Sequence, residues 1–141
     1  MYYKKEFGYE GETKACNYLE NNEYDIIERN FSCKSGEIDI IAYDKKEDEI
    51  VFVEVKSRQQ IKYGQPAEAV DLPKINHIRR TAEYYAYIKG LENSKFRFDV
   101  IEIKNLPNNK TRLHHIIQAF DFDQGDNNDR YRQQHKDYRP R

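Results

Sequence analysis

Two stretches, GEIDIIAYD (residues 36–44) and EIVFVEVKSR (residues 49–58), decide the fold of this chain of 141 residues. Both are rich in isoleucine and valine and alternate apolar with polar side chains over part of their length, as strands of a sheet do. The polar residues 45–48 between them are typical of a tight turn. We therefore predict an antiparallel hairpin with a four-residue loop.

This loop sets the register of the hairpin, because the numbers of opposed residues then sum to 93. Asp39 would face Glu54, and Glu37 would face Lys56. Side chains directly opposed on a sheet have Cβ atoms about 4.5–5.5 Å apart, so two carboxylates in that position repel each other. The register thus predicts a pair of acidic groups that needs a compensating positive charge.

A divalent cation would compensate two such carboxylates. Oxygen ligands with few protein donors suit Mg²⁺, which keeps several waters, and Mn²⁺ is the alternative. Lys56 shares the strand face of Glu54, where an ammonium could orient or deprotonate an attacking water or neutralise charge on a phosphate. Asp39, Glu54 and Lys56 therefore form a candidate catalytic site, with the first two as metal ligands.

Glu12 is the third candidate catalytic and metal-binding acid. It lies three and seven residues before Ala15 and Leu19, so on a helix it falls on the apolar stripe. A buried carboxylate is costly without a partner, so we expect Glu12 to have one. The competing interpretation is an ordinary solvated sheet face, on which Glu54 and Lys56 form a surface ion pair.

The rest of the chain predicts helices and further strands around the hairpin. The order is α-β-β-β-α-β-β, an α/β domain over residues 1–123 with a mixed central sheet flanked by helices. A proline at residue 73 and the preceding Asp71 indicate the start of the long helix. Residues 124–141 are predicted to form a disordered basic tail. The expected elements are helices at 8–22 and from 71 to about 90, a short helical stretch at 67–70, and strands at 24–31, 36–44, 49–58, 96–104 and 112–117.

Composition and charge exclude several classes of protein. No apolar run is long enough to span a membrane, and no secretory signal precedes the first helix. Two cysteines without a neighbouring Cys/His cluster favour a reducing, cytoplasmic compartment. The net charge of −1 is uneven: residues 56–80 and 130–141 each carry +4, which leaves −9 for the remainder. Such asymmetry is compatible with a polyanion partner, although a solvated helix surface and tail explain it without one.

Several separate blocks of this sequence, covering residues 8–122, resemble the bacterial YraN family of uncharacterised proteins. They agree in order and spacing and comprise GEIDII, VFVEVKSR, Gly11-Glu12 with Ala15, Arg29-Asn30, Gly64, Pro66 to Val70, Lys74, Phe98-Asp99-Val100 and Ala119-Phe120. The resemblance implies a restriction-endonuclease-like fold with the PD-(D/E)xK metal site also found in archaeal Holliday-junction resolvases.

The resemblance gives roles to individual residues. Asp39 is the acid of the first half-motif, Glu54-Val55-Lys56 is the ExK half, and Glu12 matches the helix-borne acid of the resolvase-like branch. Ile38 stands where the motif has proline. The resemblance implies a nuclease fold. The set of Glu12, Asp39, Glu54 and Lys56 beside a +4 segment leads to the hypothesis of a Mg²⁺-dependent endonuclease acting on DNA, with branched or damaged duplex as the candidate substrate. A homodimer is expected from the resolvase likeness.

An inactive nucleic-acid-binding or adaptor module on the same fold is the alternative function. Its phosphate contacts would come from basic side chains near the site and on the long helix. The candidates are Arg58, Lys74, Arg79 and Arg80. A protein-protein module using the acidic face is a third possibility. A binder gains nothing from repelling carboxylates, so the acid-acid-lysine set favours the enzyme.

Overall fold

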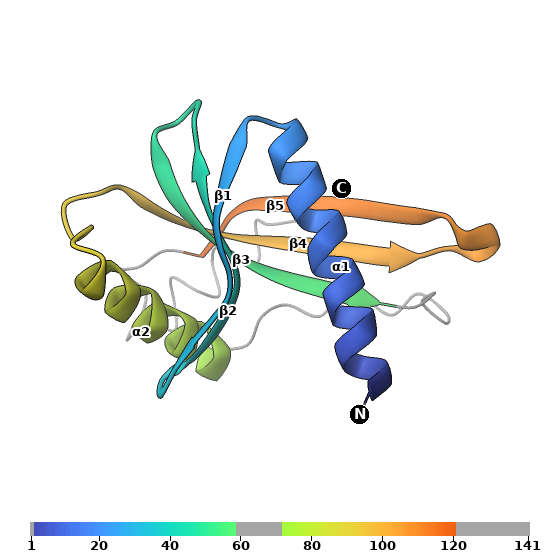
Figure 1. Cartoon of the computed structure of the whole chain (residues 1–141), viewed down its shortest axis with the longest axis horizontal. Coiled ribbons are helices and arrows are strands. Elements are labelled where there is room, and N and C mark those ends of the chain that lie inside the picture. The colour runs from blue at the N-terminus through green and yellow to red at the C-terminus, as the bar shows by residue number, and fades with distance from the viewer. Residues whose placement is uncertain (1, 59–71, 121–141) are drawn as a thin grey trace.

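The computed structural model describes residues 2–58 and 72–120, in which two helices flank a five-stranded mixed sheet (Figure 1). A 3-10 turn, η1 (Pro107–Asn109), links the last two strands. The other elements are α1 (Tyr2–Asn21), β1 (Tyr24–Cys33), β2 (Gly36–Asp44), β3 (Glu49–Arg58), α2 (Leu72–Ile88), β4 (Phe96–Asn105) and β5 (Thr111–Phe120).

The strands lie in the sheet in their order along the chain, from β1 to β5. Neighbours are antiparallel except for β3 and β4, which are parallel and are joined by the segment that contains α2. The hairpin of β2 and β3 pairs from Ile40 with Val53 to Asp44 with Glu49. Each of these pairs sums to 93, so the predicted register is confirmed over this length.

Two hydrophobic clusters form the core, one on each face of the sheet. Side chains of α2 such as Tyr85 pack with Phe52 and Phe98. On the other face, Leu19 of α1 packs with Val53 and other strand residues. Phe52 and Val53 are neighbours in sequence yet belong to different clusters, because successive strand side chains point to opposite faces. α1 and α2 therefore cover opposite faces of the sheet (Figure 1).

The structure confirms the predicted fold class, an α/β arrangement consistent with a restriction-endonuclease-like fold. The bounds of β2 and β3 are those predicted from sequence, whereas α1 begins at Tyr2 and β1 and β5 extend further than expected. The short helix expected at 67–70 and the tail at 124–141 lie outside the described residues. No helix of the described part is long and apolar enough to cross a membrane.

Gly11 allows α1 to approach the end of β3 closely. A Cβ atom at this position would lie 1.9 Å from Ser57 Oγ and 3.2 Å from Ser57 Cβ. A larger residue would displace the Ser57 side chain, so glycine fits the narrow space between helix and strand. This close approach matters for the site because the next residue of α1 is Glu12, whose side chain is thereby held near β2 and β3.

Candidate active site

Strands β2 and β3 stop pairing where the candidate site begins. Their ladder ends at Ile40 and Val53, and two residues further along β3 the backbone N–H of Val55 donates to Asp39 Oδ2 at 2.8 Å. A side-chain carboxylate thus takes the place of a main-chain acceptor, which satisfies the free N–H. Asp39 is fixed beside Glu54 as the register predicted, although the two lie just beyond the last paired residues.

The surroundings of Asp39 hold its carboxyl group in the protonated form. Burial and the negative charge of Glu54 raise the pKa of Asp39 to about 8, with smaller contributions from Glu12 and Glu37, while the Val55 N–H acts in the opposite direction. Three acidic side chains from α1, β2 and β3 therefore lie within electrostatic range of Asp39. Without a cation, one of these four acids keeps a proton at neutral pH.

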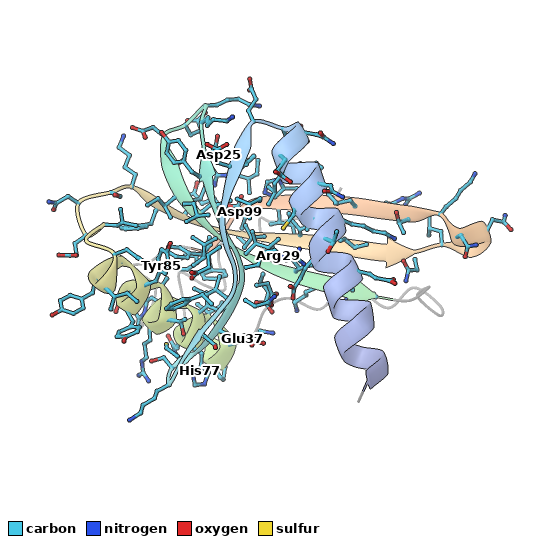
Figure 2. All side chains as sticks on the ribbon, in the orientation of Figure 1. Asp25, Arg29, Glu37, His77, Tyr85 and Asp99 are labelled. Atoms are coloured by element: carbon cyan, nitrogen blue, oxygen red, sulfur yellow. The ribbon has the colours of Figure 1, made fainter. Side chains whose placement is uncertain are left out.

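Glu12 has the partners that its position on the apolar stripe predicted. Burial raises its pKa, while a hydrogen bond with Asn30 and the charge of Arg29 lower it. Arg29 Nη2 lies 3.7 Å from Glu12 Oε1 and donates to Thr13 Oγ1 at 3.1 Å. Figure 2 shows Arg29 beside α1. Sequence reasoning anticipated a partner but did not identify Arg29, because the contact joins α1 to β1 across the fold.

Glu54 is paired with Lys74 at the start of α2. The carboxylate of Glu54 is buried, and its Oε1 lies 2.6 Å from Lys74 Nζ. A cavity of about 520 Å³ opens beside this pair, and Glu37, Lys34 and His77 also line it. Lys74 was predicted to contact nucleic acid, and the structure brings it directly to the candidate site instead of leaving it on a remote helix surface.

The other predicted residues lie around this centre. Lys56 is half-buried two residues beyond Glu54 on β3, and strand alternation places it on the same face as Glu54. Arg58 ends β3, half-buried. Arg79 and Arg80 lie further along α2 and, among the described residues, are not part of the cavity lining.

The donor set suits a hard divalent cation. Glu54 offers buried and Asp39 half-buried carboxylate oxygens, whose mutual repulsion a cation would relieve, and Glu12 and Glu37 add negative charge nearby. In the described part of the chain, no three Asp, Glu, His or Cys side chains stand together as a ready-made ligand group. Lys74 at Glu54 and Arg29 at Glu12 supply positive charge to two of the acids instead.

The raised pKa of Asp39 gives a testable pH dependence in the metal-free protein. The folded state binds a proton that the unfolded chain releases near pH 3.8, so this contribution to stability is complete below that pH and is lost as the pH rises through about 8. Between pH 5 and pH 7, the free energy of unfolding of the wild type should fall by about 1–3 kcal/mol relative to that of Asp39→Asn.

Urea unfolding in the presence of a chelator measures this difference. Asp25→Asn, a change at an exposed carboxylate of β1 that pairs with Lys45, is the matched control and should follow the wild type. Figure 2 shows Asp25 and Glu37 at opposite ends of the hairpin of β1 and β2. Parallel pH profiles for the wild type and Asp39→Asn would contradict the assigned protonation state.

A second polar cluster surrounds Arg97 of β4, at the opposite end of β3 from Glu54. All five N–H groups of this buried guanidinium have an acceptor at 2.8–3.2 Å, and the cluster continues through Asp99 to His115. The acceptors of Arg97 are Asp44, Glu49, Asp99 and Tyr24. Sequence reasoning missed this cluster, whose signal was that Arg97 and Asp99 share a strand face with the apolar Ile101 and Ile103.

Comparison with known proteins shows relatives over most of the chain. A sequence model of the uncharacterised protein family UPF0102 matches residues 11–103. A UPF0102 protein of Caldicellulosiruptor saccharolyticus is 44% identical over 118 residues, which are 83% of this chain and 98% of that protein. UPF0102 proteins of Clostridium botulinum and Clostridioides difficile are 49% identical over 121 and 116 residues, covering 84% and 82% of this chain and 97% of each relative.

Proposed function

The chain belongs to the uncharacterised protein family UPF0102, and we propose that it is a Mg²⁺-dependent endonuclease that hydrolyses phosphodiester bonds of DNA. The membership also confirms the resemblance to the YraN family, which is UPF0102. A family without an assigned activity gives no chemistry, so the proposal rests on the site. The observation that carries it is the pairing of the half-buried Asp39 with the buried Glu54, at the point where β2 and β3 separate.

Asp39 and Glu54 would hold the cation, with Glu12 as a further acid. When bound, a divalent cation supplies Lewis-acid polarisation of a phosphoryl oxygen and lowers the pKa of bound water. Asp39 must release its proton to become a ligand, since burial and Glu54 raise its pKa to about 8. Binding of the cation should therefore strengthen with rising pH and release a proton.

Lys56 has the position for a role in the reaction itself. It shares a strand face with Glu54, so its ammonium would reach the phosphate held beside that carboxylate. A positive charge there stabilises the developing negative charge of the phosphoryl group in the transition state, and a neutral amine could instead accept a proton from the attacking water. DNA as the partner, branched duplex as the preferred form and a homodimer belong to the same proposal.

Incubation of the protein with linear, nicked, flapped and four-way-junction DNA in Mg²⁺ or Mn²⁺ tests the function. Cleavage of at least one substrate is expected, together with a loss of 10²-fold or more in Lys56→Ala. Lys45→Ala is the matched control, because Lys45 is an exposed residue of the turn between β2 and β3 and pairs at the surface with Asp25. Failure to cleave any of these substrates, or cleavage that survives Lys56→Ala, would refute the proposal.

The same assay separates the enzyme from an inactive binding module. A binding module would show salt-sensitive affinity for DNA that is indifferent to Asp39→Asn. The enzyme requires that this substitution eliminate both the dependence on metal and the cleavage. Burial and the neighbouring Glu54 raise the pKa of Asp39 to about 8, and such a pair of acids has no use in a module that only contacts phosphates, which is why the enzyme is favoured.

A further inference from the structure

The ion pair between Lys74 and Glu54 joins two side chains of very different exposure. The Glu54 side chain is 9% exposed and the Lys74 side chain is 50% exposed, with 2.6 Å between Oε1 and Nζ. The carboxylate is therefore held by the fold, whereas the lysine is an arm that reaches it from the first turn of α2. A buried carboxylate without a cation is costly, and in the metal-free protein Lys74 supplies that cation.

A divalent cation on Glu54 would compete with this ammonium. The proposed metal needs the oxygens of Glu54, and two positive charges held within a few ångströms of each other repel strongly in a half-buried site. The exposed arm of Lys74 can move, whereas Glu54 cannot. Binding of the metal should therefore displace the Lys74 ammonium from Glu54.

The cavity beside the pair offers a place for the displaced ammonium. It measures about 520 Å³ and lies between the hairpin of β1 and β2 and the start of α2, where Lys34 and His77 also line it. The Nδ1 atom of His77 lies 3.1 Å from the carbonyl oxygen of Ser35. A carbonyl oxygen only accepts, so Nδ1 carries the proton and Nε2 remains for another contact. Figure 2 shows His77 close to Glu37, at this end of α2.

We propose that Lys74 occupies the metal position in the metal-free protein and is released by the metal to bind a phosphate of the nucleic acid in this cavity. The released ammonium would add a positive charge to this part of the cavity, which Lys34 and Glu37 also line, and could contact a phosphate there. Metal and nucleic acid would then favour each other, because the metal frees a phosphate-binding group that Glu54 otherwise holds. This inference rests on the proposed function, since it requires a cation on Asp39 and Glu54.

Calorimetric titration of the full chain with Mn²⁺ tests the first part of the proposal, that Lys74 occupies the metal position. Lys74→Gln should bind Mn²⁺ about 10-fold more tightly than the wild type, because no ammonium competes for Glu54. Lys34→Gln removes the same charge from the same cavity and should stay within about 2-fold of the wild type. Equal affinities for the wild type and Lys74→Gln, or equal gains in both variants, would overturn the proposal.

The second part of the proposal, that Lys74 is released to a phosphate, is tested by measuring the binding of a duplex oligonucleotide with and without Ca²⁺. Ca²⁺ is used in place of Mg²⁺ to support binding. The gain in affinity that Ca²⁺ gives should be about 5-fold smaller in Lys74→Gln than in the wild type, whereas Lys34→Gln should keep the full gain. An undiminished gain in Lys74→Gln would overturn the release of Lys74 to phosphate. Because Lys74 is half exposed, both variants should fold, which thermal unfolding verifies.

The outcomes separate this inference from the proposed function. If neither the wild type nor any variant binds Mn²⁺, the metal site is refuted and this inference falls with it. If the wild type binds Mn²⁺ and Lys74→Gln binds it equally well, only the role of Lys74 is refuted. Tight binding by Lys74→Gln and weak binding by the wild type is the result that supports the proposal most directly.

Discussion

Asp39→Asn is expected to eliminate binding of Mg²⁺ or Mn²⁺ and to reduce DNA cleavage by at least 10³-fold. The substitution keeps the size of the side chain, and the amide oxygen can still accept the hydrogen bond from the Val55 N–H, which is 2.8 Å long in the wild type. It removes the carboxyl group that must lose its proton to bind the cation and that lies near Glu54, Glu12 and Glu37. The fold should therefore survive, while the protein loses one of the carboxylate ligands that the cation needs.

Two measurements check this prediction. Calorimetry with Mn²⁺ should show no saturable binding in Asp39→Asn, and single-turnover cleavage should give the loss of rate. Asp25→Asn makes the same chemical change at an exposed carboxylate on β1 and should leave both measurements within 2-fold of the wild type. Retention of metal binding by Asp39→Asn would mean that the cation is held by other residues.

Release of a proton gives an independent test of the same carboxyl group. With the pKa of Asp39 raised to about 8 in the metal-free protein, binding of Mn²⁺ at pH 7 requires Asp39 to lose its proton. The heat of binding should therefore depend on the ionisation enthalpy of the buffer, and the affinity should rise up to about 10-fold per pH unit below pH 8. A heat that is the same in every buffer would contradict the protonated state of Asp39.

The hairpin of β2 and β3 shows how much of the structure can be predicted from the local sequence pattern. Its loop and its alternation determine the register, so the bounds of β2 and β3 and the proximity of Asp39 to Glu54 follow from sequence. The separation of the strands beyond Ile40 does not follow, because the Asp39 side chain replaces a main-chain acceptor there. No propensity or period predicts such a substitution of one acceptor for another.

Contacts between elements that are distant in sequence could not be predicted, for a different reason. The position of Glu12 on the apolar stripe predicts that it has a partner, but Arg29 becomes that partner only because β1 returns beside α1. Lys74 reads as one more basic residue of a solvated helix, and its contact with Glu54 depends on where α2 packs against the sheet. Periodicity gives the face of an element, whereas the identity of a cross-element partner depends on tertiary packing.

Arg97→Met is expected to lower the free energy of unfolding by about 3–5 kcal/mol, the largest loss of stability that we predict for any single residue. The substitution removes a guanidinium with five satisfied N–H groups. It leaves the carboxylate of Asp99 fully buried and that of Asp44 nearly so, each without its cation. Methionine fills much of the volume, so the loss reports the unpaired charges and not a cavity.

The pKa of Asp44 gives this prediction its pH dependence. Burial raises the pKa of Asp44. The hydrogen bond from Arg97 and those from the N–H groups of Glu47 and Lys46 lower it by more, so the pKa lies below its ordinary value. The stabilisation by this carboxylate is therefore present above the unfolded pKa of about 3.8 and is lost as the pH falls through the folded pKa. The wild type should lose stability in acid more steeply than Arg97→Met.

Urea unfolding at pH 7 and pH 4 measures both effects, and a double variant identifies their cause. Adding Asp44→Asn to Arg97→Met removes one of the two carboxylates that lack their guanidinium partner. The double variant should therefore recover about 1–2 kcal/mol of the lost free energy of unfolding at pH 7. Asp44→Asn alone breaks the pair from the other side and should be destabilising. If the double variant is less stable than Arg97→Met, then Arg97 contributes through packing against Tyr24 and its neighbours, and the charge balance of the cluster is not what holds this end of the sheet together.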